Sequence, residues 1–399
     1  MTGLAGQETR QERPALELAD IVRAHAADLG PLVAAQRTAL RAIANCRTEV
    51  LGGRRHACSS CGFEQVIFNS CRNRHCPRCQ GRAQHEWVSR QVEHVLPVEY
   101  FHVVFTIPDG LHLFFLLGQA VAYNLLFAAV AETLTEVAAN PDRLGAQLGF
   151  IGVLHTWTQT LLYHPHIHCL VPGGGLSPDR RRWIPSKTGY FLPVRVLGLV
   201  FRGKLLSKLE TALETEKIKL TGQQGHKALR QAARKRWNVY AKPPFAGPEA
   251  VLRYLGRYTH RIAISNRRLL EFSNNQVTFS YRDRANGDRR RSMTLPAVEF
   301  LQRFVRHVVP GGFHRIRHFG FLANSVRREA LALCRQLLEV GRVEPETKLA
   351  PDGSPEKDVA AAITSAPICP RCRTGTLLLT ETLLPQTTRW AWPGRSTSP

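Results

Sequence analysis

The feature that most constrains this chain is a block of cysteines near its N-terminus. Six of its ten cysteines fall between Cys46 and Cys79, and four of them form the Cys-x-x-Cys pairs Cys58–Cys61 and Cys76–Cys79. Each short turn presents two thiolates to one cation, and four thiolates that leave no open position are typical of a structural zinc site. We therefore expect Cys58, Cys61, Cys76 and Cys79 to bind one structural Zn²⁺ rather than to be unliganded core residues.

Other potential ligands surround this block without a clear assignment. Cys46, His56, Cys71 and His75 could build a second zinc site or pack as core residues, and the spacing leaves both possibilities open. A further pair, Cys369 and Cys372, resembles half of a zinc knuckle without its second half. That pair leaves open whether the C-terminal tail is intact or has been altered or truncated. The chain shows no export leader, so we expect a reducing compartment, which favours metal binding over disulfides.

Positive charge is concentrated in one part of the chain. The net charge is +23, and residues 201–330 hold 27 Lys and Arg against nine Asp and Glu. A solvated surface usually mixes both signs, so this excess predicts a polyanionic partner, namely nucleic acid. Residues 111–131 are apolar enough to imitate a membrane span, but they include His112, Gln119 and Asn124, so we expect a buried helix. The chain is expected to be soluble, cytoplasmic and nucleoid-associated, with no membrane partner.

The pattern along the chain predicts the α+β class. Strand-like alternation over 98–107, 148–156 and 162–171 is interleaved with expected helices at 111–138, 195–215, 225–236 and 296–308. A hairpin is expected in 262–282 around Asn274-Asn275. Short crossovers cannot join all of these strands, so the sheet should be largely antiparallel. The predicted domains are an N-terminal helical segment (1–45), a zinc-binding module (46–95), a catalytic and DNA-binding domain (96–330) and a partly disordered tail (331–399). The sequence contains no glycine-rich phosphate-binding loop, so we expect no nucleotide cofactor.

The run His164-Pro-His166-Ile-His168 carries the clearest indication of a catalytic metal. Side chains two apart on a strand share a face, so His166 and His168 can hold one cation. His155 ends the preceding strand-like run and would reach the same ion if the two runs pair as antiparallel neighbours. His164 is the rival for that third position. A His-x-His pair is commonly a satisfied core or surface pair, but the glycine turn 173–175 that follows leaves space for a substrate backbone.

Two tyrosines are spaced by one helical turn. Tyr254 and Tyr258 lie at i and i+4, and Arg253, Arg257 and Arg261 place positive charge around them, as a DNA-binding segment requires. Such a pair alone is commonly amphipathic packing. Beside a cation site it predicts nucleophilic tyrosines, because a cation can polarise a scissile phosphate that a phenol of pKa near 10 otherwise attacks poorly.

Together these segments resemble the HUH (His–hydrophobic–His) nucleases, and more specifically the transposases of the insertion sequence 91 family. The resemblance covers roughly residues 40–325. It rests on SCRNRHCPRCQ, VLHTWTQTLLYHPHIHCLVPGGG, YLGRYTHRIAISNRR and FHRIRHFGFLAN, which occur in that family's order.

The resemblance implies a rolling-circle DNA transposase. His166 and His168 would bind Mg²⁺ or Mn²⁺ with His155 as third ligand, and Tyr254 and Tyr258 would be the nucleophiles. Cleavage of single-stranded DNA at the element's ends and target would leave a 5′-phosphotyrosine and a free 3′-hydroxyl, without ATP. The zinc module would help to recognise the element's end. The fold would be an HUH-nuclease-like, five-stranded antiparallel sheet with flanking helices, preceded by the small zinc-binding module.

Two other functions remain as alternatives. A plasmid replication initiator or relaxase would use the same chemistry, although the zinc block and the paired tyrosines favour the transposase. A non-catalytic, zinc-dependent DNA-binding protein would contain the same cysteines and the same basic segment, with the histidine and tyrosine motifs incidental.

Overall fold

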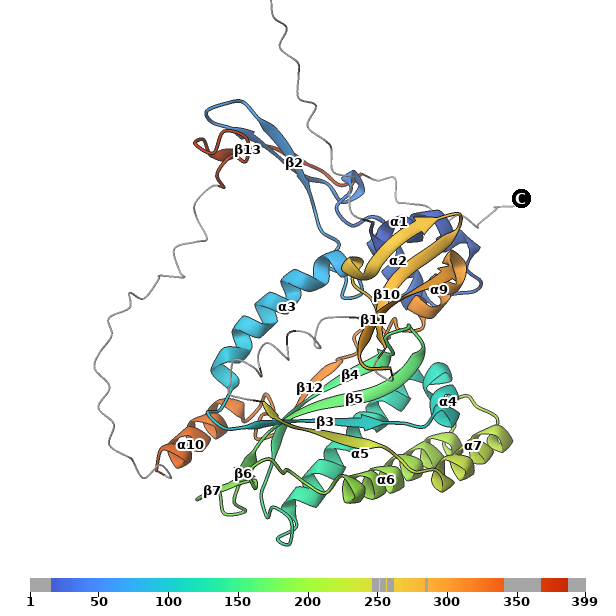
Figure 1. Cartoon of the computed structure of the whole chain (residues 1–399), viewed down its shortest axis with the longest axis vertical. Helices are drawn as coiled ribbons and strands as arrows, with labels where there is room; N and C mark the ends of the chain where they lie inside the picture. The colour runs from blue at the N-terminus through green and yellow to red at the C-terminus, as the bar shows by residue number, and fades with distance from the viewer. Residues whose placement is uncertain are drawn as a thin grey trace, which may run out of the picture.

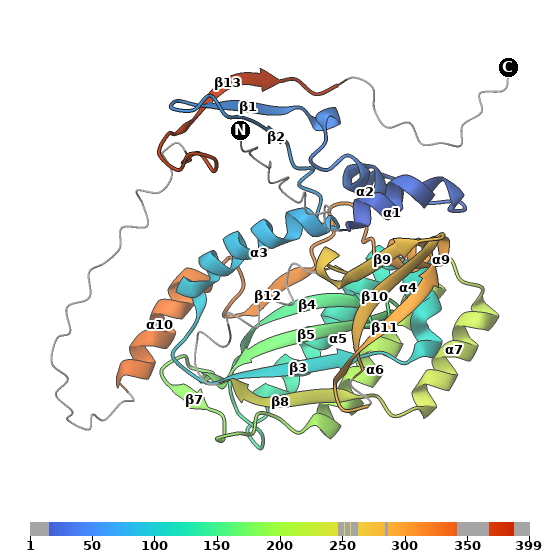
Figure 2. The ribbon, with the colours of Figure 1, turned by 45° about the horizontal axis from the view of Figure 1, so that its top comes forward.

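The computed structural model describes residues 16–245, 251, 256, 262–283, 286–340 and 367–386. A five-stranded sheet forms its centre, in the order β12-β4-β5-β3-β8 (Figures 1 and 2). Every neighbouring pair is antiparallel. The predicted α+β class and antiparallel sheet are therefore confirmed. The strands are β3 (Tyr100–Thr106), β4 (Gly149–Trp157), β5 (Tyr163–Pro172), β8 (Val239–Phe245) and β12 (Ile316–Gly320).

Helices cover one face of this sheet. The odd-numbered side chains of β3 and β5 are apolar and buried, among them Phe101, Phe105 and Ile167. They pack on α5 (Gln119–Ala139) and α6 (Val194–Glu214), with α4 (His112–Leu117) and α7 (Gly222–Arg234) alongside (Figure 1). In the part of the chain that the structure describes, α5 is the one helix long and apolar enough to cross a membrane, and half of its apolar window is buried. It lies where the sequence predicted a core helix.

The opposite face of the sheet carries the histidines. There β5 presents His164, His166 and His168 in alternation with buried neighbours. The helix α3 (Pro77–Gln91) passes above this face (Figure 2). Its Trp87 packs with Leu170 of β5 and Val251 in a small apolar cluster that also includes Tyr100. The face of the sheet that carries these histidines, here called the histidine face, is therefore partly covered by α3.

A second apolar core joins segments that the sequence analysis assigned to separate domains. The helices α1 (Leu18–His25) and α2 (Ala34–Ala44) pack with α9 (Ala297–Val305) and with a three-stranded sheet. That sheet consists of β9 (Leu269–Ser273), β10 (Gln276–Asp283) and β11 (Arg289–Pro296). Asn274 and Asn275 connect β9 to β10 with φ of 49° and 59°, as a two-residue hairpin turn with two left-handed residues requires.

A third sheet contains strands from both ends of the described chain. β1 (Gly53–Cys58) pairs with β2 (Glu64–Phe68) and, on its other edge, with β13 (Leu377–Leu383). This ribbon projects away from the central sheet (Figures 1 and 2). The expected tail therefore contains an ordered strand, because β13 completes the backbone hydrogen bonds of β1. Residues 341–366 and 387–399 lie outside the described residues.

The remaining elements flank the central sheet or connect strands. The helix α10 (Arg327–Val340) packs against Ile151 and Val153 of β4 and on the small pair β6 (Gly174–Leu176) and β7 (Trp183–Pro185). Short 3₁₀ turns are found at Ala26–Asp28, Glu49–Leu51, Val92–His94, Asp109–Leu111 and Asn266–Arg268.

His307 connects the second core to the central sheet. It is 1% exposed, and its Nδ1 accepts a hydrogen bond from the Thr156 hydroxyl (3.2 Å) while its Nε2–H donates to the Leu161 carbonyl (3.1 Å). Burial lowers the pKa of His307 to about 4. The folded protein therefore holds this imidazole neutral, whereas the unfolded chain protonates it below about pH 6.5.

Acidification should destabilise the fold through His307. Between about pH 6.5 and pH 4 the unfolded chain binds a proton that the folded one does not, so the free energy of unfolding should fall by up to about 3 kcal/mol. We expect His307→Gln, which cannot titrate, to show a smaller decrease. Urea unfolding at a series of pH values measures both. An unchanged pH dependence in the variant would contradict this assignment.

Candidate active site

Antiparallel pairing of β4 with β5 brings three of the predicted histidines together. His155 lies directly opposite His166, and Val153 opposite His168. One ring nitrogen of each of His155, His166 and His168 lies within 4.8 Å of the others. The ring centroids of His155 and His168 are 4.3 Å apart, and those of His166 and His168 are 4.8 Å apart. Three imidazoles at this separation can direct nitrogens at one divalent cation.

His164 belongs to a different group. Its Nδ1 lies 3.9 Å from a carboxylate oxygen of Asp109, which in turn lies 3.5 Å from Nε2 of His112. These three residues form a separate cluster of potential ligands. Of the two rivals for the third position, the geometry therefore favours His155.

Hydrogen bonds orient two of these histidines. His166 Nδ1–H donates to the His164 carbonyl (2.6 Å), which leaves Nε2 as the lone-pair nitrogen. His168 Nδ1 lies 2.7 Å from Nε2 of His102, a residue of β3 that is 3% exposed. Fixing one ring nitrogen by a hydrogen bond sets the tautomer and the direction of the other, as at known metal sites.

His102 was not among the residues predicted from the sequence, although the strand pattern around it points to the histidine face. The alternation of β3 buries Phe101 and Val103 against the helices, so His102 must face the opposite side of the sheet. That side is the one that carries His166 and His168.

If His155, His166 and His168 hold the catalytic cation that the sequence predicts, replacing His102 should impair the predicted strand cleavage without removing a ligand. We expect His102→Phe to lower the cleavage rate by roughly 10- to 100-fold and to raise the Mn²⁺ concentration needed for half-maximal rate, because His168 loses its orientation. His102→Gln, which keeps a hydrogen-bonding group, should recover much of the rate. Cleavage assays over a Mn²⁺ titration test this. If the cleavage rate of His102→Phe stays low at every Mn²⁺ concentration, and His102→Gln is equally slow, the cause would be a folding defect and the orienting role would be contradicted.

The two predicted nucleophiles lie outside the described residues, as do the three predicted DNA-binding arginines: Tyr254, Tyr258, Arg253, Arg257 and Arg261. Their described neighbours are informative. Val251 is wholly buried against Leu170 and Tyr100, whose positions in β5 and β3 belong to the histidine face. A Cβ on Gly256 would lie 3.0 Å from Val88 of α3. Val251 and Gly256, on either side of Tyr254 in sequence, thus lie close to the sheet's histidine face and to α3 respectively.

A basic cleft lies at the edge of the sheet, between the start of α6 and the start of β8. Its volume is about 380 Å³, and none of its lining residues is acidic. The cationic lining residues are Arg195, Arg202, Arg234, Lys235 and Arg236. Apart from Arg195, these cationic residues belong to the basic segment 201–330 that the sequence assigned to nucleic acid.

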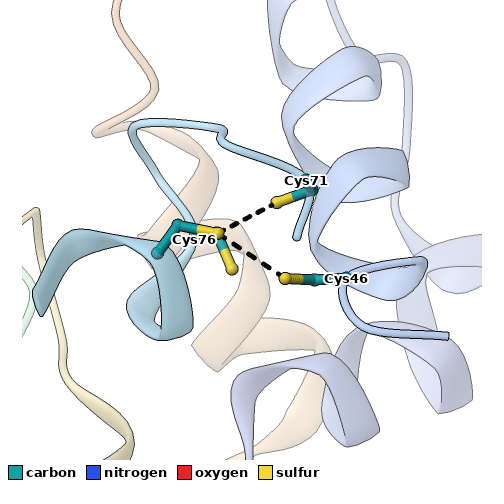
Figure 3. Close-up of side chains that lie close together, drawn as sticks. Cys46, Cys71 and Cys76 are labelled. Carbon is teal, nitrogen blue, oxygen red and sulfur yellow. Dashed lines mark hydrogen bonds between the residues drawn. The ribbon is translucent and has the colours of Figure 1, made fainter. Parts of the chain in front are cut away.

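The predicted zinc quartet is divided between two clusters. Cys76 and Cys79 lie with Cys46 and Cys71, with Sγ–Sγ distances of 3.6 Å from Cys79 to both Cys46 and Cys71. Figure 3 shows the Cys46, Cys71 and Cys76 side chains pointing at one another. Grouping Cys58, Cys61, Cys76 and Cys79 in one site was therefore wrong, because β1 and β2 carry the first pair away from the second core.

The Cys46 cluster fits a tetrahedral zinc ion. Four sulfurs at about 2.3 Å from one zinc lie about 3.8 Å apart, close to the distances found. The Cys76 thiol donates hydrogen bonds to Cys46 and Cys71, and these bonds together with burial raise its pKa far above its usual range. Four thiolates packed this closely are stable only around a cation.

The two leftover histidines are not part of this cluster. His75 Nδ1–H donates to Asn73 (3.1 Å), and its Nε2 accepts the Val309 N–H (3.2 Å), so both nitrogens are used by hydrogen bonds. His56 lies in β1, where it pairs with Gln65 and Leu379. Of the four residues left open, Cys46 and Cys71 are ligand candidates and His56 and His75 are not.

Cys58 and Cys61 lie with Cys369 and Cys372. The C-terminal Cys-x-x-Cys pair therefore does have a second half, and the expectation that this half was missing was wrong. The sequence could not show this pairing, because Cys58 and Cys372 are 314 residues apart.

Comparison with known proteins identifies the family. A family model described as "Putative transposase" matches residues 149–330. A second model, the "Transposase zinc-binding domain" of insertion sequence 91 transposases, matches residues 19–107. The chain is 46% identical over 377 residues to a protein named "Putative transposase y4qJ" of Sinorhizobium fredii, covering 92% of this chain and 95% of that protein. The chain belongs to the insertion sequence 91 family of transposases.

A second relative in this family is more distant. The chain is 29% identical over 320 residues to the "Transposase for insertion sequence element IS801" of Pseudomonas savastanoi pv. phaseolicola, covering 76% of this chain and 74% of that protein. No solved structure matches the chain. As an insertion sequence 91 transposase the protein acts on DNA, and its N-terminal module is a structural zinc-binding module.

Proposed function

We propose that this transposase cuts and rejoins single-stranded DNA at the ends of its element and at its target through a covalent 5′-phosphotyrosine. The observation that carries the proposal is the convergence of His155, His166 and His168 on one face of the antiparallel sheet, with ring nitrogens within 4.8 Å of one another. Mg²⁺ or Mn²⁺ held there would polarise the scissile phosphate and offset the negative charge of the transition state.

The residues of the chain divide the remaining work. The phenolic oxygen of Tyr254 or Tyr258 gives up its proton and attacks phosphorus, and the bond from phosphorus to the 3′-oxygen breaks. The 3′-oxygen takes up one proton in exchange and leaves as a 3′-hydroxyl. The phosphodiester to tyrosine conserves the bond for a later attack by another 3′-hydroxyl. Two tyrosines allow one linkage on a donor strand and one on a target strand.

Two features of the structure support this division. Val251, three residues before Tyr254 in sequence, packs on Leu170 of β5, which shares its face with His166 and His168, so Val251 lies close to the histidine face. The basic cleft lined by Arg195, Arg202 and Arg236 offers phosphate contacts at the edge of the same sheet.

The test is a covalent adduct. The protein is incubated with Mn²⁺ and a single-stranded oligonucleotide that carries the element's end, and the products are boiled in detergent before electrophoresis. We expect a protein–DNA adduct in the wild type and in Tyr190→Phe, an exposed tyrosine used as the control. The adduct should be absent when Tyr254 and Tyr258 are both replaced by Phe. Tight binding without an adduct at any cation concentration would favour a non-catalytic DNA-binding protein.

A further inference from the structure

The tip of the ribbon brings four thiols together from distant parts of the chain. Sγ of Cys58 lies 3.6 Å from Sγ of Cys372, and Sγ of Cys61 lies 3.8 Å from Sγ of Cys369. All four sulfurs lie within 4.8 Å of one another. A disulfide would need about 2.05 Å, whereas sulfurs around one tetrahedral zinc lie about 3.8 Å apart. The distances fit a shared metal ion.

The two halves of this cluster are built alike. Cys58 N–H donates to the Phe63 carbonyl (2.9 Å) and Cys369 N–H to the Gly375 carbonyl (2.7 Å). The residue after each second cysteine is left-handed, with φ of 70° at Gly62 and 59° at Arg373. Two equivalent turns that face each other are the geometry by which Cys-x-x-Cys pairs present four sulfurs to one ion.

Backbone groups also point at the sulfurs. Ser60 N–H donates to Cys58 Sγ (3.4 Å), and Gly375 N–H donates to Cys372 Sγ (3.3 Å). Such bonds stabilise thiolates that ligate a metal. The turns approach so closely that a Cβ on Gly375 would lie 2.5 Å from Cys58 Sγ.

The apolar surface around the cluster is too small to hold the ribbon tip together by itself. Cys58, Cys369 and Leu377 are buried there, with Phe63 and Cys372 packed against them. A core of this size does not normally fix a loop closed over 314 residues, and small modules of this kind depend on a metal.

We propose that Cys58, Cys61, Cys369 and Cys372 bind a second structural zinc ion, separate from the one at the Cys46 cluster. This zinc fastens residues 367–386 to the N-terminal module, so that the module is assembled from both ends of the described chain. The family model for the zinc-binding domain spans residues 19–107 and therefore covers only half of this ligand set.

Metal analysis of the purified full-length chain tests this independently of DNA cleavage. We expect two zinc ions per chain in the wild type and one in the double variant Cys369→Ser/Cys372→Ser. Cys334→Ala, which removes a buried thiol outside both clusters, is the matched control and should keep two. Cys372→His should also keep two, because three cysteines and one histidine are a common zinc ligand set.

Other outcomes overturn the proposal. One zinc per chain in the wild type, or two in the Cys369→Ser/Cys372→Ser variant, would exclude a second site. A disulfide in the protein denatured without reductant would show that the thiols are oxidised instead. The central sheet packs through a different core, so this variant should keep its cooperative unfolding and remain informative. The two proposals fail separately. Absence of a phosphotyrosine adduct in the wild type would contradict the proposed function, whereas the zinc content alone decides on the second site.

Discussion

Replacing His166 by Ala should abolish strand cleavage while leaving DNA affinity nearly unchanged. We expect the cleavage rate to fall by on the order of a thousandfold or more, because the site loses a ligand whose Nε2 is directed by the hydrogen bond from Nδ1 to the His164 carbonyl. DNA affinity should change by no more than about twofold, since phosphate contacts from the basic segment supply most of it. Covalent-adduct formation and fluorescence anisotropy measure the two quantities.

A neighbouring histidine provides the control for this experiment. His318 lies in the same sheet, on β12 opposite Ile151, and is not a member of the His155 cluster. His318→Ala should therefore retain cleavage. Equal losses of cleavage and DNA affinity in a folded His166→Ala protein would show that the histidines serve binding rather than chemistry.

Replacing Cys76 by Ser should destabilise the second core as well as remove a zinc ion. Cys76 is 1% exposed and lies in the apolar cluster that joins α1, α2 and α9. We expect the zinc content to fall by one ion per chain and the melting temperature to drop by roughly 10 °C or more, because metal binding contributes directly to folding free energy. Metal analysis and thermal unfolding followed by circular dichroism measure these effects.

The same variant should also lose cleavage. Cys76 is the N-cap residue of α3, and α3 carries Trp87 over the histidine face. Loss of the zinc would therefore release one end of the helix that covers the histidine face. Cys169→Ala, which removes a buried thiol behind the sheet, is a suitable comparison for the effect of a lost thiol. Unchanged zinc content and melting temperature in Cys76→Ser would contradict the Cys46, Cys71, Cys76 and Cys79 assignment.

The histidine cluster was accessible from the sequence because it depends on local rules. Alternation along a strand places His166 and His168 on one face, and a short connection between two runs makes them antiparallel neighbours. That pairing set His155 opposite His166. The choice between His155 and His164 needed coordinates, because the two differ in the neighbours that α4 and the loop before it bring, namely His112 and Asp109.

The zinc ligands show where such reasoning fails. Each Cys-x-x-Cys pair can be recognised in the sequence, but the spacing does not indicate which pairs share an ion. For Cys58–Cys61 the nearest pair in sequence, Cys76–Cys79, was the wrong partner. Cys58 and Cys61 lie at the connection between β1 and β2. Their partners, Cys369 and Cys372, come just before β13, after all strands of the central sheet in sequence. Contacts across this many residues depend on tertiary topology, which no local pattern encodes.

The pairing of β1 with β13 also sets an order of events during synthesis. The ribosome synthesises all strands of the central sheet and all elements of the second core before β13. The edge of β1 that pairs with β13 therefore stays unpaired until the end of synthesis. The nascent polypeptide can fold its central sheet first and complete the β1–β2–β13 ribbon last. A chain released early, by a nonsense codon or by proteolysis before Leu377, would therefore keep its sheet of histidines but lack a finished ribbon.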